Sequence, residues 1–206
     1  MSSYTTEKER GIKMKRNRKL MLLSALMACF MLLMIGCSSG TKTTDGKTDI
    51  GIVLPTKDEP RWVQDETRFN EALAATDYSV EILFSQGSSA KEKENVESLL
   101  TKGIKVLIIC PQDGDAAAAA AEAAAKEGVK VISYDRLITG TDAVNYYVTF
   151  DSIAVGAAQG QYLIDKATGK DNPLYLYAGA ASDNNAFLFF EGAWSVLQPK
   201  IADGTF

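Results

Sequence analysis

Polar side chains follow the predicted strands of this chain, at the point where each strand ends. Asp135 and Arg136 come directly after the β-branched segment at 129–133, whose composition is that of a buried parallel strand. An acid beside a guanidinium is badly placed for a core. It is well placed for a ligand, because open α/β sheets bind ligands in the crevice outside the carboxyl ends of their strands. Other predicted strands are followed in the same way by Lys57, Arg61 and Trp62, by Ser85 and Gln86, by Gln112 and Asp113, and by Asp183, Asn184 and Asn185.

These groups offer planar, multi-point hydrogen bonds and one large aromatic ring, which is the chemistry that a sugar requires. Every sugar hydroxyl both donates and accepts, and it is buried at a tolerable cost only where it finds partners. The C–H face of a pyranose is apolar and suits an indole. Taken singly, each group has an ordinary explanation: a helix cap for Asp183, surface ion pairs for Arg61 and Arg136, a core position for Trp62, and turns for Gln86, Gln112 and Asp113. Their convergence on one sheet edge favours a ligand site.

The elements that must position these groups alternate between strand and helix. We expect strands at 49–54, 78–84, 105–110, 129–133, 145–150 and 174–177. We expect helices at 61–75, 91–102, 115–127, 152–167 and 185–197, the last ended by Pro199. The alternation predicts an α/β fold with a doubly wound parallel sheet and right-handed crossovers.

The first 36 residues have the pattern of a targeting segment. A basic stretch precedes an apolar run at 20–35, which has the length of a signal-peptide core and is short for a spanning helix. The run ends in Gly36-Cys37, and this ending resembles the lipobox of bacterial lipoproteins. The resemblance implies cleavage before Cys37 and a lipid on its sulfur; the alternative is an uncleaved membrane anchor. Residues 37–48 would then form a flexible tether, because they are rich in Ser, Thr, Gly and Lys.

Composition excludes several functions. Once the leader with its seven basic and two acidic residues is set aside, 15 basic and 24 acidic residues remain, a net charge of −9. Such an acidic body argues against nucleic acid as a partner. The chain has no histidine, which excludes Ser–His and Cys–His catalysis and histidine metal ligation. We expect no metal and no cofactor, and we interpret Cys110 as a small core residue.

Four motifs, in order, resemble a known family. They are Arg61-Trp62, Tyr134-Asp135-Arg136, Thr149-Phe150-Asp151 and Asp183-Asn184-Asn185-Ala186. Together they resemble the periplasmic sugar-binding proteins of ABC transporters, of the xylose-binding and multiple-monosaccharide-binding kind, over about residues 49–206. The resemblance implies a type I periplasmic-binding fold whose two lobes, joined by a hinge, close over a monosaccharide. It also implies ligand-binding roles for Arg61, Trp62, Asp135, Arg136, Asp183 and Asn185, and a hinge at Asp151 and Ser152.

The same resemblance implies a domain organisation. Residues 49–151 would form the N-terminal sugar-binding lobe, and residues 152–206 would begin the second lobe. Members of the family continue well past this length. On this reading the chain is truncated, with the first lobe nearly complete and the second only begun.

The implied function is that of a binding protein and not of an enzyme. A lipid-anchored extracytoplasmic protein, at the outer face of the cytoplasmic membrane or in the periplasm, would deliver a sugar of the xylose, glucose, arabinose or galactose type to an ABC permease. A sugar sensor that docks on a chemoreceptor or a sensor kinase is the alternative. A remote alternative is a penicillin-binding or β-lactamase-type serine enzyme, because Ser88-Ser89-Ala90-Lys91 and Ser182-Asp183-Asn184 match two of its three motifs. The third motif, Lys-Thr-Gly, does not follow them.

Overall fold

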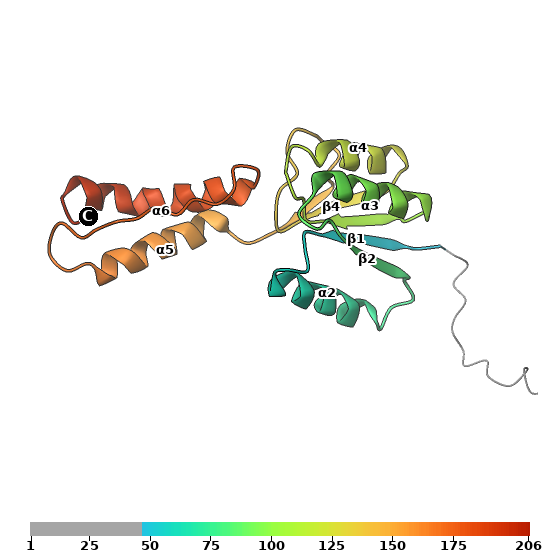
Figure 1. The fold of residues 1–206 in the computed structure, drawn as a ribbon, viewed down its shortest axis with the longest axis horizontal. Coiled ribbons are helices and arrows are strands. Elements are labelled where there is room, and N and C mark those ends of the chain that lie inside the picture. The colour runs from blue at the N-terminus through green and yellow to red at the C-terminus, as the bar shows by residue number, and fades with distance from the viewer. Residues whose placement is uncertain (1–46) are drawn as a thin grey trace, which may run out of the picture. The chain divides into compact units, whose positions relative to one another are not determined.

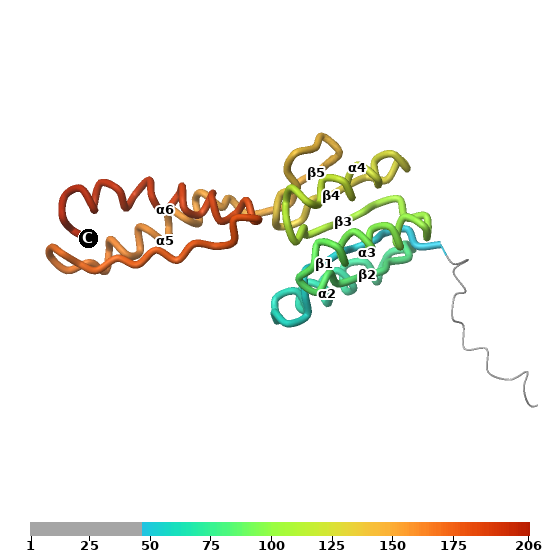
Figure 2. Tube along the Cα trace, turned by 45° about the horizontal axis from the view of Figure 1, so that its top comes forward, coloured from blue at the N-terminus to red at the C-terminus, as the bar shows by residue number. Residues whose placement is uncertain are grey.

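The computed structural model describes residues 47–206 and contains a five-stranded, all-parallel sheet with the strand order β2-β1-β3-β4-β5 (Figures 1 and 2). The strands are β1 (Ile50–Leu54), β2 (Val80–Phe84), β3 (Val106–Ile109), β4 (Lys130–Tyr134) and β5 (Tyr146–Val148). The helices are α2 (Pro60–Leu73), α3 (Ser89–Thr101), α4 (Ala118–Lys126), α5 (Ser152–Lys166) and α6 (Asn184–Ala202). The predicted α/β fold with a doubly wound parallel sheet is therefore confirmed.

The sheet has a core on each face, because side chains alternate along a strand. In the interior strand β1, Val53 packs into the cluster that includes residues of α3 and α4, whereas Ile52 and Leu54 pack into the cluster that includes Trp62 of α2. Figure 1 shows α2 on one side of the sheet and α3 and α4 on the other. Because helices lie on both faces of the sheet, a ligand can reach it at the carboxyl ends of the strands, where ligands of such folds bind.

The α5 and α6 helices pack against each other through glycine. A Cβ added to Gly192 would lie 2.0 Å from the backbone oxygen of Ile153, and one added to Gly156 would lie 2.2 Å from that of Phe189. The two backbones therefore approach more closely than any side chain would permit. Figure 2 shows the helices side by side, with the chain that joins them running back along the pair.

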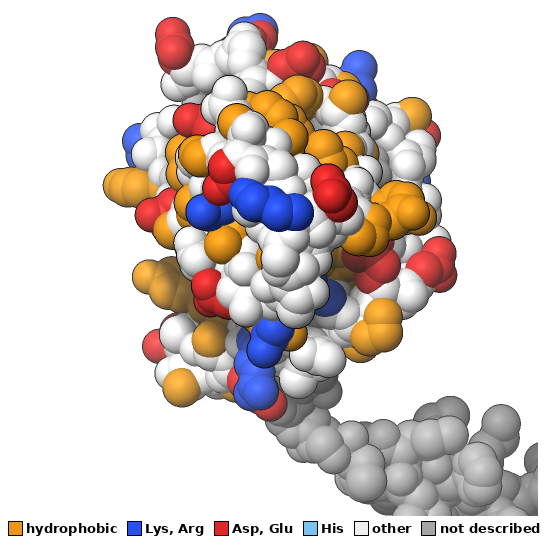
Figure 3. Space-filling view, turned by 90° about the vertical axis from the view of Figure 1, so that its left-hand side faces the viewer, with side chains coloured by type: hydrophobic (Ala, Val, Ile, Leu, Met, Phe, Trp, Pro, Cys, Tyr) orange, Lys and Arg blue, Asp and Glu red, His pale blue; other side chains and the backbone are white. Residues whose placement is uncertain are grey.

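The strand predicted at 174–177 is wrong for this structure, in which the segment has no regular secondary structure. Its β-type pattern finds no neighbouring strand among the described residues, and an isolated strand leaves its backbone donors and acceptors unpaired. The side chains of Tyr175, Leu176 and Tyr177 are exposed, that of Tyr177 completely so at 102%. Figure 3, which looks onto the face where α5 and α6 are nearest the viewer, shows hydrophobic side chains at the surface there.

The prediction that Pro199 ends the last helix is also wrong. Helix α6 includes Pro199 and continues to Ala202. The C-cap is Asp203, and Gly204 follows it with a φ of +78°. The N–H of Gly204 donates to the oxygen of Ile201, and that of Thr205 donates to the oxygen of Lys200 at 2.9 Å. These two bonds form a Schellman motif, in which glycine supplies the left-handed conformation that closes a helix.

The predicted leader and Cys37 lie outside the described residues, and so does most of the predicted tether. Its last two residues already contact the sheet unit: the oxygen of Lys47 accepts from the Ser79 hydroxyl at 2.8 Å, and the N–H of Thr48 donates to the oxygen of Lys102. None of the helices within residues 47–206 is long and apolar enough to cross a membrane. All five strands fall within 49–151, and α5 and α6 fall within 152–206, while the division into two lobes stays a prediction.

Candidate binding site

All six residues predicted to bind a ligand line one cavity of about 190 Å³. Its volume corresponds to about six water molecules, which suits a single small molecule. Three elements supply the residues: the first turn of α2, the turn after β4, and the segment that begins α6. The cavity is lined by Arg61, Trp62, Asp135, Arg136, Asp183 and Asn185, together with Glu59, Thr149, Phe150, Ser152 and Phe189.

The Arg61 and Asp135 side chains form an ion pair across the cavity wall. The Asp135 side chain is nearly buried, whereas that of Arg61 is half exposed, and the Arg61 guanidinium also lies 3.8 Å from Asp65. The pair joins α2 to the turn after β4. A ligand that enters the cavity meets both members of this pair as hydrogen-bonding groups, the guanidinium as donor and the carboxylate as acceptor.

Trp62 is a core residue as well as a lining residue. It is 1% exposed and packs with Ile52, Leu54 and other apolar side chains. Its indole N–H donates to a carboxylate oxygen of Glu59 at 3.0 Å. The guanidinium carbons of Arg61 and Arg136 lie 4.4 and 5.6 Å from the ring centroid. The ring therefore supports two cations as a cation–π partner, and stacking of a sugar on it requires those groups to shift.

The chain turns sharply at Asp135. Its φ is +62°, and the N–H of Arg136 donates to the oxygen of Tyr134 at 2.7 Å. A hydrogen bond between residues i and i+2 around a positive central φ is the rare, strained form of γ-turn. Successive side chains of a strand point to opposite faces, but here both Asp135 and Arg136 line the same cavity.

The Asp183 side chain combines the capping role with an ion pair. One carboxylate oxygen accepts from the N–H of Asn185 at 2.9 Å and so caps α6. The other lies 3.0 Å from Nε of Arg136. Arg136 also donates to the oxygen of Pro111, at 3.3 Å. The helix cap and the charge partner therefore coexist in one residue.

Asn185 and the two predicted hinge residues lie beside this ion pair. The Asn185 amide donates to the carbonyl of Asp135 at 3.0 Å and accepts from the Ser152 hydroxyl at 3.1 Å. Asp151 caps α5 by accepting from the N–H of Ala154. Asn185 and Ser152 are both buried, so these contacts orient the amide. The hinge role of Asp151 and Ser152 stays a prediction.

Some residues that follow strands lie elsewhere, and others in the cavity were missed. Gln86 and Gln112 do not line the cavity, and Lys57 instead pairs with Glu66. Phe189 was missed although it lies one helical turn beyond Asn185, a spacing that places two residues on the same face. Glu59 was missed as well; it lies at the N-cap position of α2, directly before Pro60.

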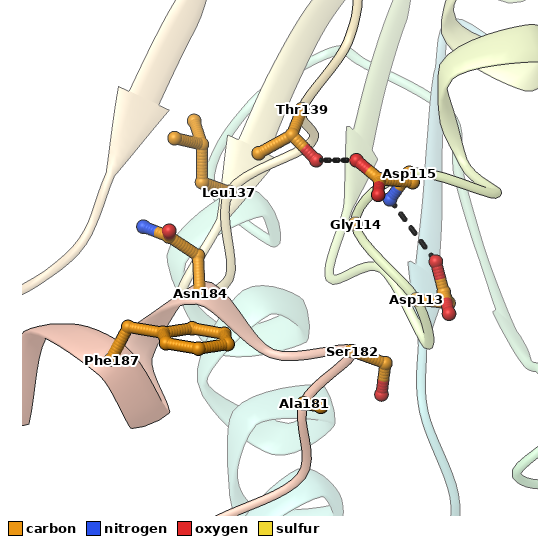
Figure 4. Close-up of a pocket in the computed structure, with 9 residues that line it drawn as sticks. All are labelled: Asp113, Gly114, Asp115, Leu137, Thr139, Ala181, Ser182, Asn184 and Phe187. Carbon is orange, nitrogen blue, oxygen red and sulfur yellow. Dashed lines mark hydrogen bonds between the residues drawn. The ribbon is translucent and has the colours of Figure 1, made fainter.

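A larger cavity of about 630 Å³ has a different lining (Figure 4). The residues are Asp113, Gly114, Asp115, Leu137, Thr139, Ala181, Ser182, Asn184 and Phe187. Both acids of this lining already have hydrogen-bond partners. Asp113 accepts from the N–H groups of Asp115 and Ala116, and Asp115 accepts from the Thr139 hydroxyl. None of the six predicted ligand residues lines it, so it is not the predicted site.

Glu92 is a buried carboxyl group beneath the site. It is 2% exposed, and it accepts from the N–H of Gln112 at 2.7 Å. This bond holds the loop whose Pro111 oxygen accepts from Arg136. Burial raises the pKa of Glu92 to about 7, with Arg136 acting in the opposite sense and Asp113 in the same sense.

We expect Glu92 to make the folded state less stable as the pH rises. From pH 4.5, its ordinary pKa, to about 7, the unfolded chain loses this proton while the folded chain keeps it, so stability falls and then levels off above 7. Over this pH range the free energy of unfolding falls by about 3 kcal/mol. Glu92→Gln should abolish it, whereas Glu97→Gln on the exposed face of α3 should not. Urea unfolding at pH 5 and pH 8 measures this, and the prediction is wrong if Glu92→Gln and the unmodified chain show the same pH dependence.

The serine motif of the enzyme alternative has a structural explanation. The Ser88 hydroxyl accepts from the N–H of Lys91 and so caps α3, while the Lys91 ammonium lies 3.1 Å from Glu94. A serine bound to its own helix and a lysine paired with an acid are not the activated nucleophile and base that such enzymes need.

Comparison with known proteins agrees with the fold. A family model described as a periplasmic binding protein domain matches residues 50–205. A carbohydrate transporter solute binding protein from Chloroflexus aurantiacus, solved with D-glucose, is 81% identical with a TM-score of 0.74, over 78% of this chain and 47% of that chain. An ABC transporter solute binding protein from Clostridium phytofermentans, solved with β-D-glucose, is 36% identical with a TM-score of 0.71, over 76% of this chain and 49% of that chain.

A curated relative extends the comparison. The multiple sugar-binding periplasmic protein of Azospirillum brasilense is 37% identical over 83% of this chain and 50% of its own length. The chain thus spans about half the length of the relatives that it matches.

Proposed function

Because the chain belongs to the periplasmic binding protein domain family, we propose that it provides the first part of a monosaccharide site in a substrate-binding protein of an ABC importer. The site is the cavity lined by the six predicted residues. The proposed role is extracytoplasmic binding and delivery of the sugar to a permease, without catalysis.

The observation that carries the proposal is the set of charges in this cavity. Two guanidinium groups, Arg61 and Arg136, face two carboxylates, Asp135 and Asp183, in ion pairs. The lining also contains a third carboxylate, Glu59, which accepts from the Trp62 indole N–H. Because each charged side chain already has a partner, the cavity has no strong preference for an ion. It does offer donors and acceptors that alternate around a small volume, and this arrangement suits a neutral molecule with many hydroxyl groups.

The named relatives support the ligand class. Two solved structures, one of them 81% identical to this chain, contain glucose, and the Azospirillum protein is named for binding multiple sugars. We therefore favour glucose or a sugar of similar shape, such as xylose. In such proteins the ligand is desolvated when lobes close over it, so that hydroxyl groups are satisfied from both sides.

The test is a chimera that joins residues 47–206 to the remaining C-terminal part of the Chloroflexus aurantiacus protein. Calorimetry should show saturable binding of D-glucose or D-xylose and no binding of L-leucine, an unrelated solute. The intact Chloroflexus aurantiacus protein is the positive control. A chimera that is folded, as judged by circular dichroism, but binds none of the monosaccharides would refute the proposed function.

We also propose that the protein is anchored to the membrane by a lipid on Cys37. The motivation is the apolar run that ends in Gly36-Cys37. Cys37→Ser should abolish lipid attachment, and the protein should either leave the membrane fraction or retain its leader. Fractionation and mass spectrometry measure both outcomes, and Cys110→Ser is the matched control because that thiol is buried in the fold. An unchanged mass and distribution for Cys37→Ser would contradict the lipid anchor.

A further inference from the structure

We propose that Tyr147 and Thr149 are positioning residues of the monosaccharide site. Their hydroxyl groups hold the backbone carbonyl of Asp135, and this contact maintains the turn that aims Asp135 and Arg136 into one cavity. The sugar as ligand rests on the proposed function, whereas the holding of the turn rests only on contacts in the structure.

The turn needs an external support. An aspartate at a φ of +62° occupies the left-handed region, which is unfavourable for residues other than glycine and, to a lesser degree, Asn and Asp. Such a conformation persists where the surroundings over-determine it, and it is frequent at binding sites. Here it has a clear consequence, because it brings two consecutive side chains of opposite charge into the same cavity.

Three consecutive residues at the end of β5 provide that support. The N–H of Asp135 donates to the oxygen of Val148 at 2.8 Å. The carbonyl of Asp135 accepts from the Tyr147 hydroxyl at 3.1 Å and from the Thr149 hydroxyl at 2.9 Å. Residues i and i+2 of a strand point to the same side, so the two hydroxyl groups reach one carbonyl while the backbone between them holds the N–H.

The following peptide is held from the opposite direction. The buried Ser133 hydroxyl donates to the oxygen of Arg136 at 2.6 Å and accepts from the N–H of Ile138 at 3.0 Å. The turn is therefore fixed on both sides of its strained residue. Tyr147 and Thr149 are the members of this arrangement that can be altered without changing the strand or the core.

The carbonyl of Asp135 also receives a third donor, the amide of Asn185, at 3.0 Å. A carbonyl oxygen has two lone pairs, so the two hydroxyl groups alone can satisfy it. The two hydroxyl groups from the end of β5 can therefore hold this carbonyl, and Asn185 of α6 adds a third donor to it.

The Tyr147 hydroxyl remains a donor over the working pH range. Burial raises the pKa of Tyr147 above its ordinary value, so the phenol keeps its proton. The Thr149 hydroxyl does not titrate in water. The support of the turn should therefore be insensitive to pH.

The test uses variants that remove only a hydroxyl group. Tyr147→Phe and Thr149→Val, alone and together, are compared with Tyr146→Phe on the exposed side of the same strand and with Thr101→Val, which breaks a hydroxyl-to-carbonyl bond in α3. The full chain is purified in a mild detergent with ¹³C-carbonyl aspartate. Loss of two donors should move the Asp135 carbonyl resonance upfield in the double variant, and the controls should leave it in place.

Binding is measured by placing the same substitutions in the chimera described above and titrating D-glucose while the indole N–H resonance of Trp62 is followed. We expect the double variant to bind about tenfold more weakly, which corresponds to the loss of about one net hydrogen bond in the site. Thr149→Ser keeps the hydroxyl group and should bind as the chimera without substitutions does. If Thr149→Ser weakens binding as much as Thr149→Val, side-chain packing is responsible and the inference is wrong.

The remaining outcomes also decide between the claims. An unmoved carbonyl resonance in the double variant overturns the inference, whatever the affinity. A shifted resonance with unchanged glucose affinity overturns the positioning role. If the chimera without substitutions binds no monosaccharide while the resonance shifts as expected, the proposed function fails and the holding of the turn stands.

Discussion

Asp135→Gly should weaken monosaccharide binding by a factor of about 30 to 150, with no loss of stability. The variant removes a nearly buried carboxylate that is paired with Arg61. A hydrogen bond to a charged group in a desolvated site contributes about 2–3 kcal/mol, which gives that factor. Calorimetry with D-glucose on the chimera measures the affinity, and thermal unfolding measures the stability.

Glycine is the informative replacement because of the backbone at this position. Alanine at a φ of +62° would add strain of about 1–2 kcal/mol and would confuse the loss of the carboxylate with a distortion of the turn. Glycine adopts this φ freely. Asp171→Gly is a matched control, since Asp171 has a φ of +59° and does not line the cavity. Equal affinities for Asp135→Gly and Asp171→Gly would mean that the Asp135 side chain does not contact the ligand.

Gly192→Ala should separate α5 from α6 and destabilise this pair by roughly 3 kcal/mol, the upper part of the range for overpacked sites. The added Cβ would lie 2.0 Å from the oxygen of Ile153 and 2.8 Å from the nitrogen of Ala157. Both are backbone atoms, so neither can move aside without moving α5. Alanine is more favourable than glycine in a helix by up to about 1 kcal/mol. A loss of stability would therefore come from the close contact with α5 and not from helix propensity.

Hydrogen exchange is the measurement for this variant. Amides of α5 and α6 should exchange faster, whereas those of β1 and β3 should not change. Gly160→Ala is the milder comparison: its Cβ would lie 2.6 Å from the Val196 side chain, which can shift, and 3.0 Å from the nearest backbone atom, the oxygen of Ala193. Equal protection of α5 and α6 in Gly192→Ala and the unmodified chain would contradict the packing described here.

The sequence alone was sufficient to predict the sheet and the sheet edge at which the polar side chains gather. Each strand from β1 to β3 is a short apolar run that is followed by a helical pattern, so a parallel sheet was the consistent solution. Parallel strands present their carboxyl ends at one edge. Arg61, Asp135 and Asp183 could therefore be expected near one another, and they line one cavity.

Sequence patterns failed where an element depended on its partners. Residues 174–177 have the pattern of a strand, yet a strand forms only beside another one, and the described residues offer no neighbour. The end of α6 was assigned to Pro199, although the backbone bonds that close the helix form around Gly204. In both cases the local pattern was interpreted without the hydrogen bonds that decide the outcome.

Only the tertiary structure decided how the side chains of the site are used. The left-handed conformation of Asp135 cannot be foreseen from its neighbours, because it is held by groups from β5 and α6 that are 12 to 50 residues away in the chain. Trp62 had two plausible roles, and its 1% exposure makes it a core residue that supports two guanidinium groups. Residue types and their spacing determine which elements form and where they end, since these depend on local periodicity. The conformation of a strained residue and the partners of a charged one depend on groups that only the folded chain brings together.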